Sequence, residues 1–271
     1  MKHEIIIRPI IFLAIFTTIA FLELKSPCRK LTTPKKLRWI NNLAIIIGNS
    51  LLLRLVFPFL AVGMAVIAHE RSWGLLNILD WPYWLEIVAG IIFLDLVIYI
   101  QHVMFHTIPL FWRLHMMHHT DLDFDLTTGL RFHPIEIMLS MGIKISAVCV
   151  FGPPIISVLL FEIILNSMAV FNHGNIKIPM HLDRFLRYFV VTPDMHRVHH
   201  SVIIRETNSN FGFNLSWWDR LFGTYKAQPK SGHVGMTIGF SQFRDPKKLT
   251  LPWLLIIPII GDPGKQPINR H

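Results

Sequence analysis

Long apolar runs dominate the first two thirds of the chain. Residues 5–24 form one run that is broken by Arg8 and Glu23, and residues 43–68 and 83–101 form two more. A helix rises about 1.5 Å per residue, so each run is long enough to cross a hydrocarbon core of roughly 30 Å. For the first run, a cleavable signal peptide is the alternative, but no small-x-small cleavage pattern precedes the charged residues that follow. We therefore predict an uncleaved anchor and two further spanning helices.

A fourth apolar stretch, residues 134–172, is interrupted by Gly152-Pro153-Pro154. This break predicts two shorter helices joined by a tight turn. The segment 25–38 carries six lysines and arginines, which favours a cytoplasmic position for that loop. The next two spans and the hairpin then bring the segments on both sides of the hairpin to the same cytoplasmic face. Residues 249–260 are too short and proline-broken to span, and we interpret them as interfacial.

The composition agrees with a bilayer environment. Of 271 residues, 52% are hydrophobic and 16% charged, and the mean hydropathy is +0.46, which is too apolar for an ordinary soluble domain. The net charge of +9 is explained more simply by anionic lipid headgroups than by nucleic acid, because basic and aromatic residues do not alternate along one polar face. Cys28 and Cys149 form no CxxC pair and are interpreted as structural.

Histidines are unusually frequent, fifteen against seventeen acidic residues, and they are clustered. His102 and His106 are four positions apart, which places both imidazoles on one helix face. Two HxxHH patterns follow, one on each side of the predicted hairpin. Their histidines are His115, His118, His119, His196, His199 and His200. A lone histidine is more often a core or surface residue held by one hydrogen bond, but three such clusters together indicate metal binding.

These eight imidazoles, with His173 as a natural ninth at the end of the hairpin, suit two metal ions rather than one. A single structural zinc needs four ligands and usually recruits thiolate, whereas imidazole also suits iron with positions open to dioxygen. A dinuclear hydrolase is the alternative enzyme. Such sites usually mix carboxylates with histidines, and only Asp121 and Asp194 lie close to the boxes. A non-catalytic membrane metal-binding protein is a further alternative.

Two other polar residues have divided interpretations. Asp95 lies seven residues before His102 on the same helix face, where it could orient a ligand histidine, pair with Arg54 or cap a neighbouring helix. His133 could be a ligand, a partner of a ligand or the start of a helix.

The chain resembles the fatty acid hydroxylase and sterol desaturase superfamily from about residue 95 to residue 225. The resemblance rests on the HxxxH, HxxHH and second HxxHH boxes in "DLVIYIQHVMFH", "LFWRLHMMHHT" and "VVTPDMHRVHHS", and on "NSNFGFNLSWWDRLFGTY". It implies an integral membrane di-iron enzyme that uses dioxygen and externally supplied electrons to hydroxylate or desaturate lipids. It assigns the ligand role to the eight box histidines and matches His173 to a further family histidine.

The resemblance leaves some details open. Some relatives carry an HxxxH between the two HxxHH boxes, whereas here Lys177 stands four after His173 and the nearest later histidine is His181. A polar segment that includes Asn210 could close over the site, and we take Asn210 and Asp95 as the candidate catalytic residues beside the ligands. Trp218, Asp219 and Arg220 belong to the same segment, where Arg220 could contact a lipid headgroup and packing of the cap is an equal alternative.

The sequence therefore predicts an all-α integral membrane helical bundle with a cytoplasmic, histidine-rich cap that holds a dinuclear metal site. We divide it into N-terminal anchor spans and basic loop (1–82), a hydroxylase-like core (83–226) and an interfacial C-terminal tail (227–271). The hypothesis is oxidation of a C–H bond of a sterol, fatty acyl chain, ether lipid or aminolipid, with hydroxylation preferred to desaturation. Two iron ions, dioxygen and a separate electron-transfer protein are the expected cofactors and partners, without nucleic acid.

Overall fold

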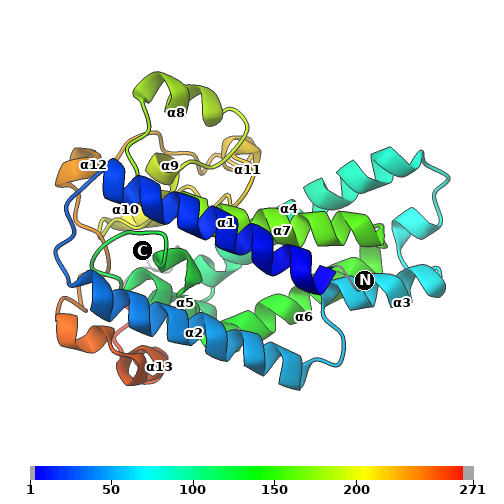
Figure 1. Ribbon diagram of the computed structural model, residues 1–271, viewed down its shortest axis with the longest axis horizontal. Helices are drawn as coiled ribbons and strands as arrows, with labels where there is room; N and C mark the ends of the chain where they lie inside the picture. Colours follow the sequence, from blue (N-terminus) through cyan, green and yellow to red (C-terminus); the bar gives the residue numbers. More distant parts are fainter. Residues whose placement is uncertain (1–3, 265–271) are drawn as a thin grey trace.

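The computed structural model describes residues 4–264, and this part of the chain is almost entirely helical (Figure 1). Isolated β-bridges, such as Pro27 with Ile176, are its only extended pairings in the described range. The α-helices are α1 (Glu4–Lys25), α2 (Lys35–Val56), α3 (Ala61–Glu70), α4 (Tyr83–Thr107), α5 (Pro109–His119), α6 (Pro134–Phe151), α7 (Ile155–Asn172), α8 (Met180–Leu186), α9 (Pro193–His199), α10 (Ile204–Thr207), α11 (Trp217–Leu221), α12 (Gly232–Gly235) and α13 (Leu251–Ile260). Short 3-10 turns are η1 (Leu75–Asn77), η2 (Thr128–Leu130) and η3 (Pro246–Leu249).

Five segments of the described chain are long and apolar enough to cross a membrane. They are α1, α2 with its continuation to residue 77, α4, α6 and α7, which confirms the predicted membrane-embedded helical bundle. The second predicted span, residues 43–68, differs from the structure. The helix α2 begins earlier, at Lys35, and ends at Val56, because Pro58 cannot continue it, and α3 is a separate short helix.

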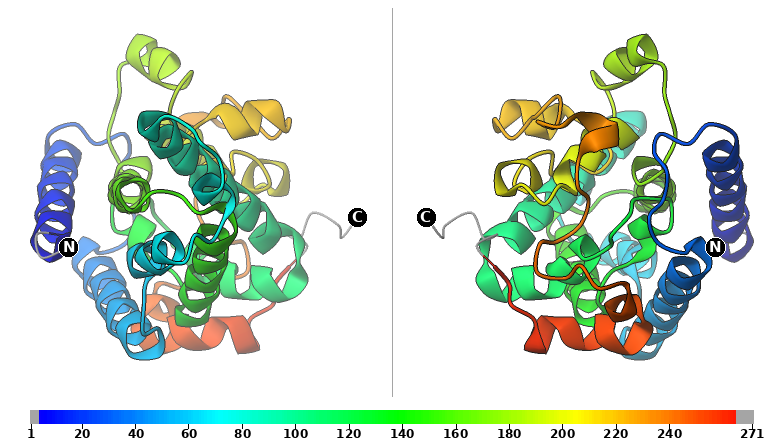
Figure 2. Two further views of the ribbon diagram at one scale, coloured as in Figure 1. Left: turned by 90° about the vertical axis from the view of Figure 1, so that its right-hand side faces the viewer. Right: turned by 90° about the vertical axis from the view of Figure 1, so that its left-hand side faces the viewer.

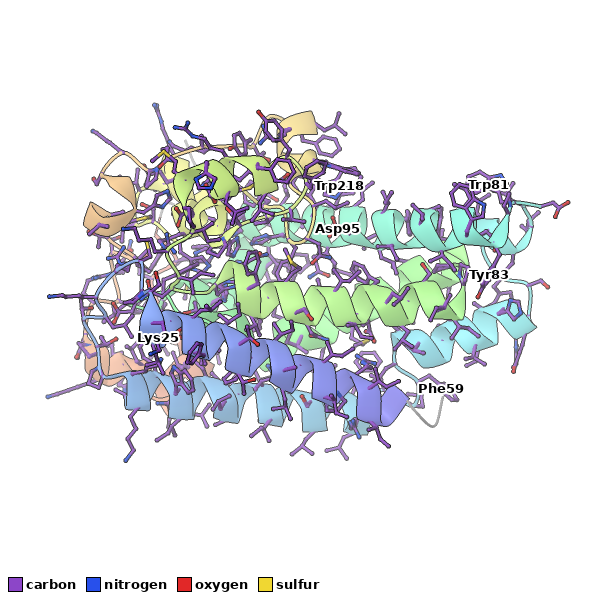
Figure 3. All side chains as sticks on the ribbon, turned by 45° about the horizontal axis from the view of Figure 1, so that its top comes forward. Lys25, Phe59, Trp81, Tyr83, Asp95 and Trp218 are labelled. Carbon is purple, nitrogen blue, oxygen red and sulfur yellow. The ribbon has the colours of Figure 1, made fainter. Side chains whose placement is uncertain are left out.

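The long helices run side by side, and the short helices α8 to α12 gather at one end of this bundle (Figure 1). Lys25 lies at that end, whereas Phe59, Trp81 and Tyr83 lie at the opposite end (Figure 3). Aromatic side chains at one end and lysine at the other are typical of helices that end at the two membrane interfaces. We call the end with the short helices the cap.

Two turns place the histidine-bearing segments in the cap. Ile108 is extended because Pro109 follows it, and α5 therefore folds back against α4 instead of continuing it. At the far end of the bundle, Gly152 ends α6 with a φ of +67°, a conformation that favours glycine. A Cβ on Gly152 would also lie 2.6 Å from the Trp73 carbonyl oxygen. This turn makes α6 and α7 the predicted hairpin.

An ionic cluster around a buried carboxylate joins α1 to the hairpin. The Glu162 carboxylate on α7 contacts Lys144 Nζ on α6 at 2.9 Å and the Arg8 guanidinium on α1 at 2.8 Å. Charges within a span are costly unless they are paired, so these two ion pairs lower the cost of placing the Glu162 carboxylate inside the bundle. The first helix is therefore fixed to the hairpin by charge as well as by apolar packing.

Candidate metal centre

Nine buried histidines converge in the cap in two groups. Within each group, one ring nitrogen from every histidine lies within 4.8 Å of the others. The first group holds His102, His106, His115, His119 and His199, and the second holds His118, His173, His196 and His200. The structure thus brings together all nine histidines that the sequence singles out, from α4, α5, α9 and the end of α7.

Helical spacing explains how each box serves two groups. On α5, His115 and His119 are four apart and enter the first group, whereas His118 points into the second. Near the end of α9, His199 belongs to the first group and the adjacent His200 to the second. An HxxHH box therefore bridges two ligand sets, so both boxes together tie the two groups to each other.

The outer nitrogen of most ligands is fixed by an acceptor. In the first group, His102 Nδ1 donates to the Phe211 carbonyl oxygen and His199 Nδ1 to the Ser209 carbonyl oxygen, both at 2.8 Å. His106 Nδ1 lies 3.2 Å from Asn208 Oδ1. Residues 208–211, which we call the cap strap, therefore hold the outer edges of three imidazoles. With the proton on Nδ1, each ring presents the Nε2 lone pair to the interior.

His115 has a carboxylate partner. Its Nδ1 lies 2.7 Å from Glu136 Oε1, and both side chains are buried. Glu136 is the third residue of α6 and lies in its first turn, after Pro134 and Ile135. A carboxylate that accepts from a ligand imidazole raises the basicity of the opposite nitrogen. Sequence reasoning missed Glu136; its only signal is a lone acidic residue at the start of an apolar helix.

The second group shows the same arrangement. His118 Nδ1 donates to the Arg131 carbonyl oxygen at 3.2 Å, and His173 Nδ1 to the Ala169 carbonyl oxygen at 2.8 Å. Their Nε2 atoms therefore carry lone pairs, yet they face each other at 3.2 Å. His196 Nε2 lies 3.1 Å from His173 Nε2. Lone pairs directed at one another repel unless a cation lies among them.

The unpaired nitrogens fit metal ions. In the first group, the Nε2 atoms of His102, His106, His115 and His199 have no hydrogen-bond partner among the described residues, and neither ring nitrogen of His119 has one. Burial lowers the pKa of His173 to about 4 and that of His199 to about 3, so both imidazoles are neutral at physiological pH. Buried, neutral nitrogens without partners are costly in an apo protein and are good ligands for a divalent metal.

The remaining predicted histidines lie outside both groups. His133 caps α6, where its Nδ1 accepts from the Ile135 N–H at 3.2 Å and its Nε2 lies 3.2 Å from the Leu255 carbonyl oxygen. His181 is exposed on α8. Of the three interpretations of His133, the helix-start role is the one that its contacts describe.

Asp95 contacts neither a ligand histidine nor Arg54. Its carboxylate accepts from the backbone N–H groups of Asn214 and Leu215 at 3.3 and 3.1 Å, and from Trp218 Nε1 at 2.8 Å. Figure 3 shows Asp95 and Trp218 side by side between α4 and the cap. These contacts fasten the cap to the spanning helix, and the catalytic role of Asp95 stays a prediction.

Asn210 is likewise occupied by the backbone. Its Nδ2 donates to the Met195 and Lys226 carbonyl oxygens, and its Oδ1 accepts from the Lys226 N–H, each at 2.8 Å. Its φ of +54° is a conformation that asparagine tolerates better than most residues. Asn210 therefore shapes the cap strap between the two carbonyls that hold His199 and His102. These contacts place Asn210 in the cap strap, and its catalytic role stays a prediction.

The acidic residues near the boxes pair with arginines. Asp121 contacts Arg38 at 2.7 Å, and Arg38 also contacts Asp125 at 2.5 Å, with all three side chains buried. Although burial opposes ionisation, the two nearby guanidinium groups, Arg38 and Arg131, lower the pKa of Asp121 to about 2. Asp194 pairs with Arg197. Neither Asp121 nor Asp194 belongs to a histidine group, so the mixed ligand set typical of dinuclear hydrolases is not formed.

Several known proteins are similar to this chain. Ornithine lipid hydroxylase of Rhizobium tropici is 29% identical over 164 residues, which cover 58% of this chain and 47% of that protein. Alkylglycerol monooxygenase of Xenopus tropicalis is 27% identical over 193 residues, covering 67% of this chain and 40% of that protein. The chain thus spans less than half of the length of either relative.

A very-long-chain aldehyde decarbonylase of Oryza sativa subsp. indica is 27% identical over 187 residues, which cover 66% of this chain and 69% of that protein. No solved structure shows significant similarity. The sequence profile of the fatty acid hydroxylase family matches residues 87–224, which include all nine clustered histidines and about half of the chain. The protein therefore belongs to the fatty acid hydroxylase family.

Proposed function

We propose that this protein is a membrane di-iron oxygenase that hydroxylates a C–H bond of a lipid. The observation that carries the proposal is the pair of adjacent, buried, all-histidine groups at the cap end of a membrane-spanning helical bundle. Nine imidazoles without a carboxylate ligand favour iron redox chemistry over hydrolysis of an ester. The names of the ornithine lipid and alkylglycerol relatives agree with a lipid substrate. The decarbonylase relative shows that family membership alone does not define the reaction.

When bound, the two irons would supply the activation of dioxygen. One oxygen atom enters the C–H bond, and the other is reduced to water by two electrons and two protons from outside the chain. The residues of the protein would hold the two irons, fix the planes of the ligand imidazoles and exclude water. Glu136 and the cap strap fix the imidazole planes, while burial of all nine rings keeps the centre dry.

We further propose that the cap is cytoplasmic and that electrons come from a separate protein. Lys25 and Lys35 begin and end the basic loop at the cap end of the bundle, and basic loops favour the cytoplasmic side. The same positive surface would attract an acidic electron-transfer partner. A reporter fused to this loop would fluoresce only on the cytoplasmic side; a reporter active only in the outer compartment would contradict this orientation.

The test begins with metal analysis and Mössbauer spectroscopy of the purified protein. We expect about two irons per chain, one for each group, with antiferromagnetic coupling in the oxidised state. The variant His118→Ala/His199→Ala removes one ligand from each group and should lose the coupled signal. The matched control His181→Ala removes an exposed histidine outside both groups and should keep it.

Lipid analysis completes the test. Cells that express the wild-type protein should accumulate a lipid that has gained one oxygen atom, and cells with the double histidine variant should not. Zinc in place of iron would favour the hydrolase, and iron without any change in lipids would favour a metal-binding protein. Protein that contains no bound metal although it was purified from cells grown with ample iron would overturn the proposal.

A further inference from the structure

We propose that the cap inserts an apolar patch into the adjacent membrane leaflet through α8 and α11. This cap patch consists of the exposed side chains of Leu182, Phe185, Phe189, Trp217, Leu221 and Phe222. The proposal concerns how the cap meets the bilayer, and it does not depend on the identity of the metal or of the substrate.

The helix α8 has an inverted distribution of polar and apolar residues. Asp183 is buried, where its carboxylate accepts from Thr192 Oγ1 at 2.6 Å and pairs with Arg187 Nε at 2.7 Å. Phe185 is 59% exposed, and Phe189 just beyond the helix is 49% exposed. A helix that faces water buries its apolar side and exposes its charges. In α8 the Asp183 carboxylate is buried, whereas Leu182 and Phe185 are exposed beside Arg184, so the outer face of the helix is largely apolar.

The helix α11 repeats the inversion. Asp219 is fully buried and accepts from the backbone N–H groups of Phe211 and Gly212, both at 2.8 Å. By contrast, Leu221 is 70% exposed and Phe222 is 54% exposed. Large contiguous apolar patches on a water-facing surface are rare and mark a contact site.

The two helices form one continuous surface. Trp217 Nε1 donates to the Tyr188 carbonyl oxygen at 2.9 Å, and Arg220 donates to the Arg187 carbonyl oxygen at 2.9 Å. Viewed along the long helices, α8 lies outside the ring that they form (Figure 2). The patch therefore extends sideways from the bundle, where the leaflet surrounds it.

Two features identify a lipid leaflet, rather than a protein, as the occupant. First, the patch lies against a spanning helix, since Phe222 stacks on Tyr99 of α4 with ring centroids 5.4 Å apart. Second, its rim is aromatic and cationic. Arg220 lies over the Tyr188 and Tyr225 rings, and Arg184 on α8 is exposed. Aromatic rings beside arginines, with apolar side chains below, are typical of helices that lie in the headgroup region.

The depth of the patch is measurable with spin labels. In a background with Cys28→Ser and Cys149→Ser, a single labelled cysteine replaces Phe185 or Leu221, and the protein is reconstituted into vesicles of phosphatidylcholine and anionic phosphatidylglycerol. Power saturation then compares collisions with oxygen, which concentrates in the bilayer, and with a water-soluble nickel chelate. Both positions are exposed, so the label displaces no core residue.

Two reference positions calibrate the result. A label at Leu13, which is exposed on α1, reports lipid, and a label at Gln228, which is exposed on the cap, reports water. We expect the oxygen-to-nickel accessibility ratios at positions 185 and 221 to exceed that at 228 several-fold and to approach that at 13. Ratios equal to the ratio at 228 would show a patch in water. Labels shielded from both reagents would show a protein contact. Either result would overturn the proposal.

Discussion

Glu136 offers the most direct test of how this protein tunes its ligands. Its carboxylate accepts a 2.7 Å hydrogen bond from His115 Nδ1 in a buried environment. A hydrogen bond to a charged partner contributes about 1.5–3 kcal/mol, against about 0.5–1.5 kcal/mol for a neutral pair. The variant Glu136→Gln keeps the size of the side chain and an acceptor oxygen but removes the charge. It should therefore weaken the free energy of metal binding by about 1 kcal/mol. That loss corresponds to a roughly five-fold weaker affinity of the first group for metal.

The variant Glu136→Ala removes the acceptor entirely. Loss of such an outer partner typically weakens metal binding by about 10- to 100-fold. Affinity is measured by chelator competition with Co²⁺, whose absorption reports the ligand set. Glu162→Gln is the matched control, because it alters a buried carboxylate of the same hairpin that pairs with Lys144 instead of a histidine. It should lower the thermal midpoint without weakening Co²⁺ binding. Wild-type affinity in both Glu136 variants would refute the reasoning.

Three further predictions concern the surroundings of the centre. Asp121→Asn removes one of the two carboxylates that pair with the buried Arg38 and leaves Asp125 as its charged partner, so it should destabilise the protein by about 1.5–3 kcal/mol in thermal unfolding. Because the pKa of Asp121 is about 2, below its usual value of 3.8, its stabilisation is present above pH 3.8 and should disappear as the pH falls toward 2; an unchanged acid profile in Asp121→Asn would contradict this. Asn210→Ala removes three hydrogen bonds from the cap strap and should lower turnover more than thermal stability, as activity and unfolding assays on one preparation would show. His173→Ala leaves three histidines in the second group, so elemental analysis should find about one metal per chain; two would exclude His173 as a ligand.

The histidine centre was predictable because its information is local. Spacings of three and four residues fix which imidazoles share a helix face, and the break at Gly152 indicates the hairpin that returns His173 to the boxes. The outer contacts were not predictable in the same way. Backbone carbonyls such as that of Phe211 leave no trace in a side-chain pattern. The Arg38–Asp121 pair joins residues 83 positions apart, and only the folded packing brings them together.

The inverted helices of the cap were missed for a related reason. A segment of five to seven residues is too short for its apolar face to be identified from periodicity, so its outward side is known only when Asp183 and Asp219 are seen to be buried. Those burials also carry a mechanical consequence. Asp219 on α11 accepts from the Phe211 N–H, and the Phe211 carbonyl oxygen in turn accepts from His102. Asp95 holds the start of α11 through Trp218. The segment that faces the lipid therefore also orients a ligand histidine. Displacement of the cap patch from the membrane should accordingly disturb the geometry of the first histidine group before it unfolds the bundle.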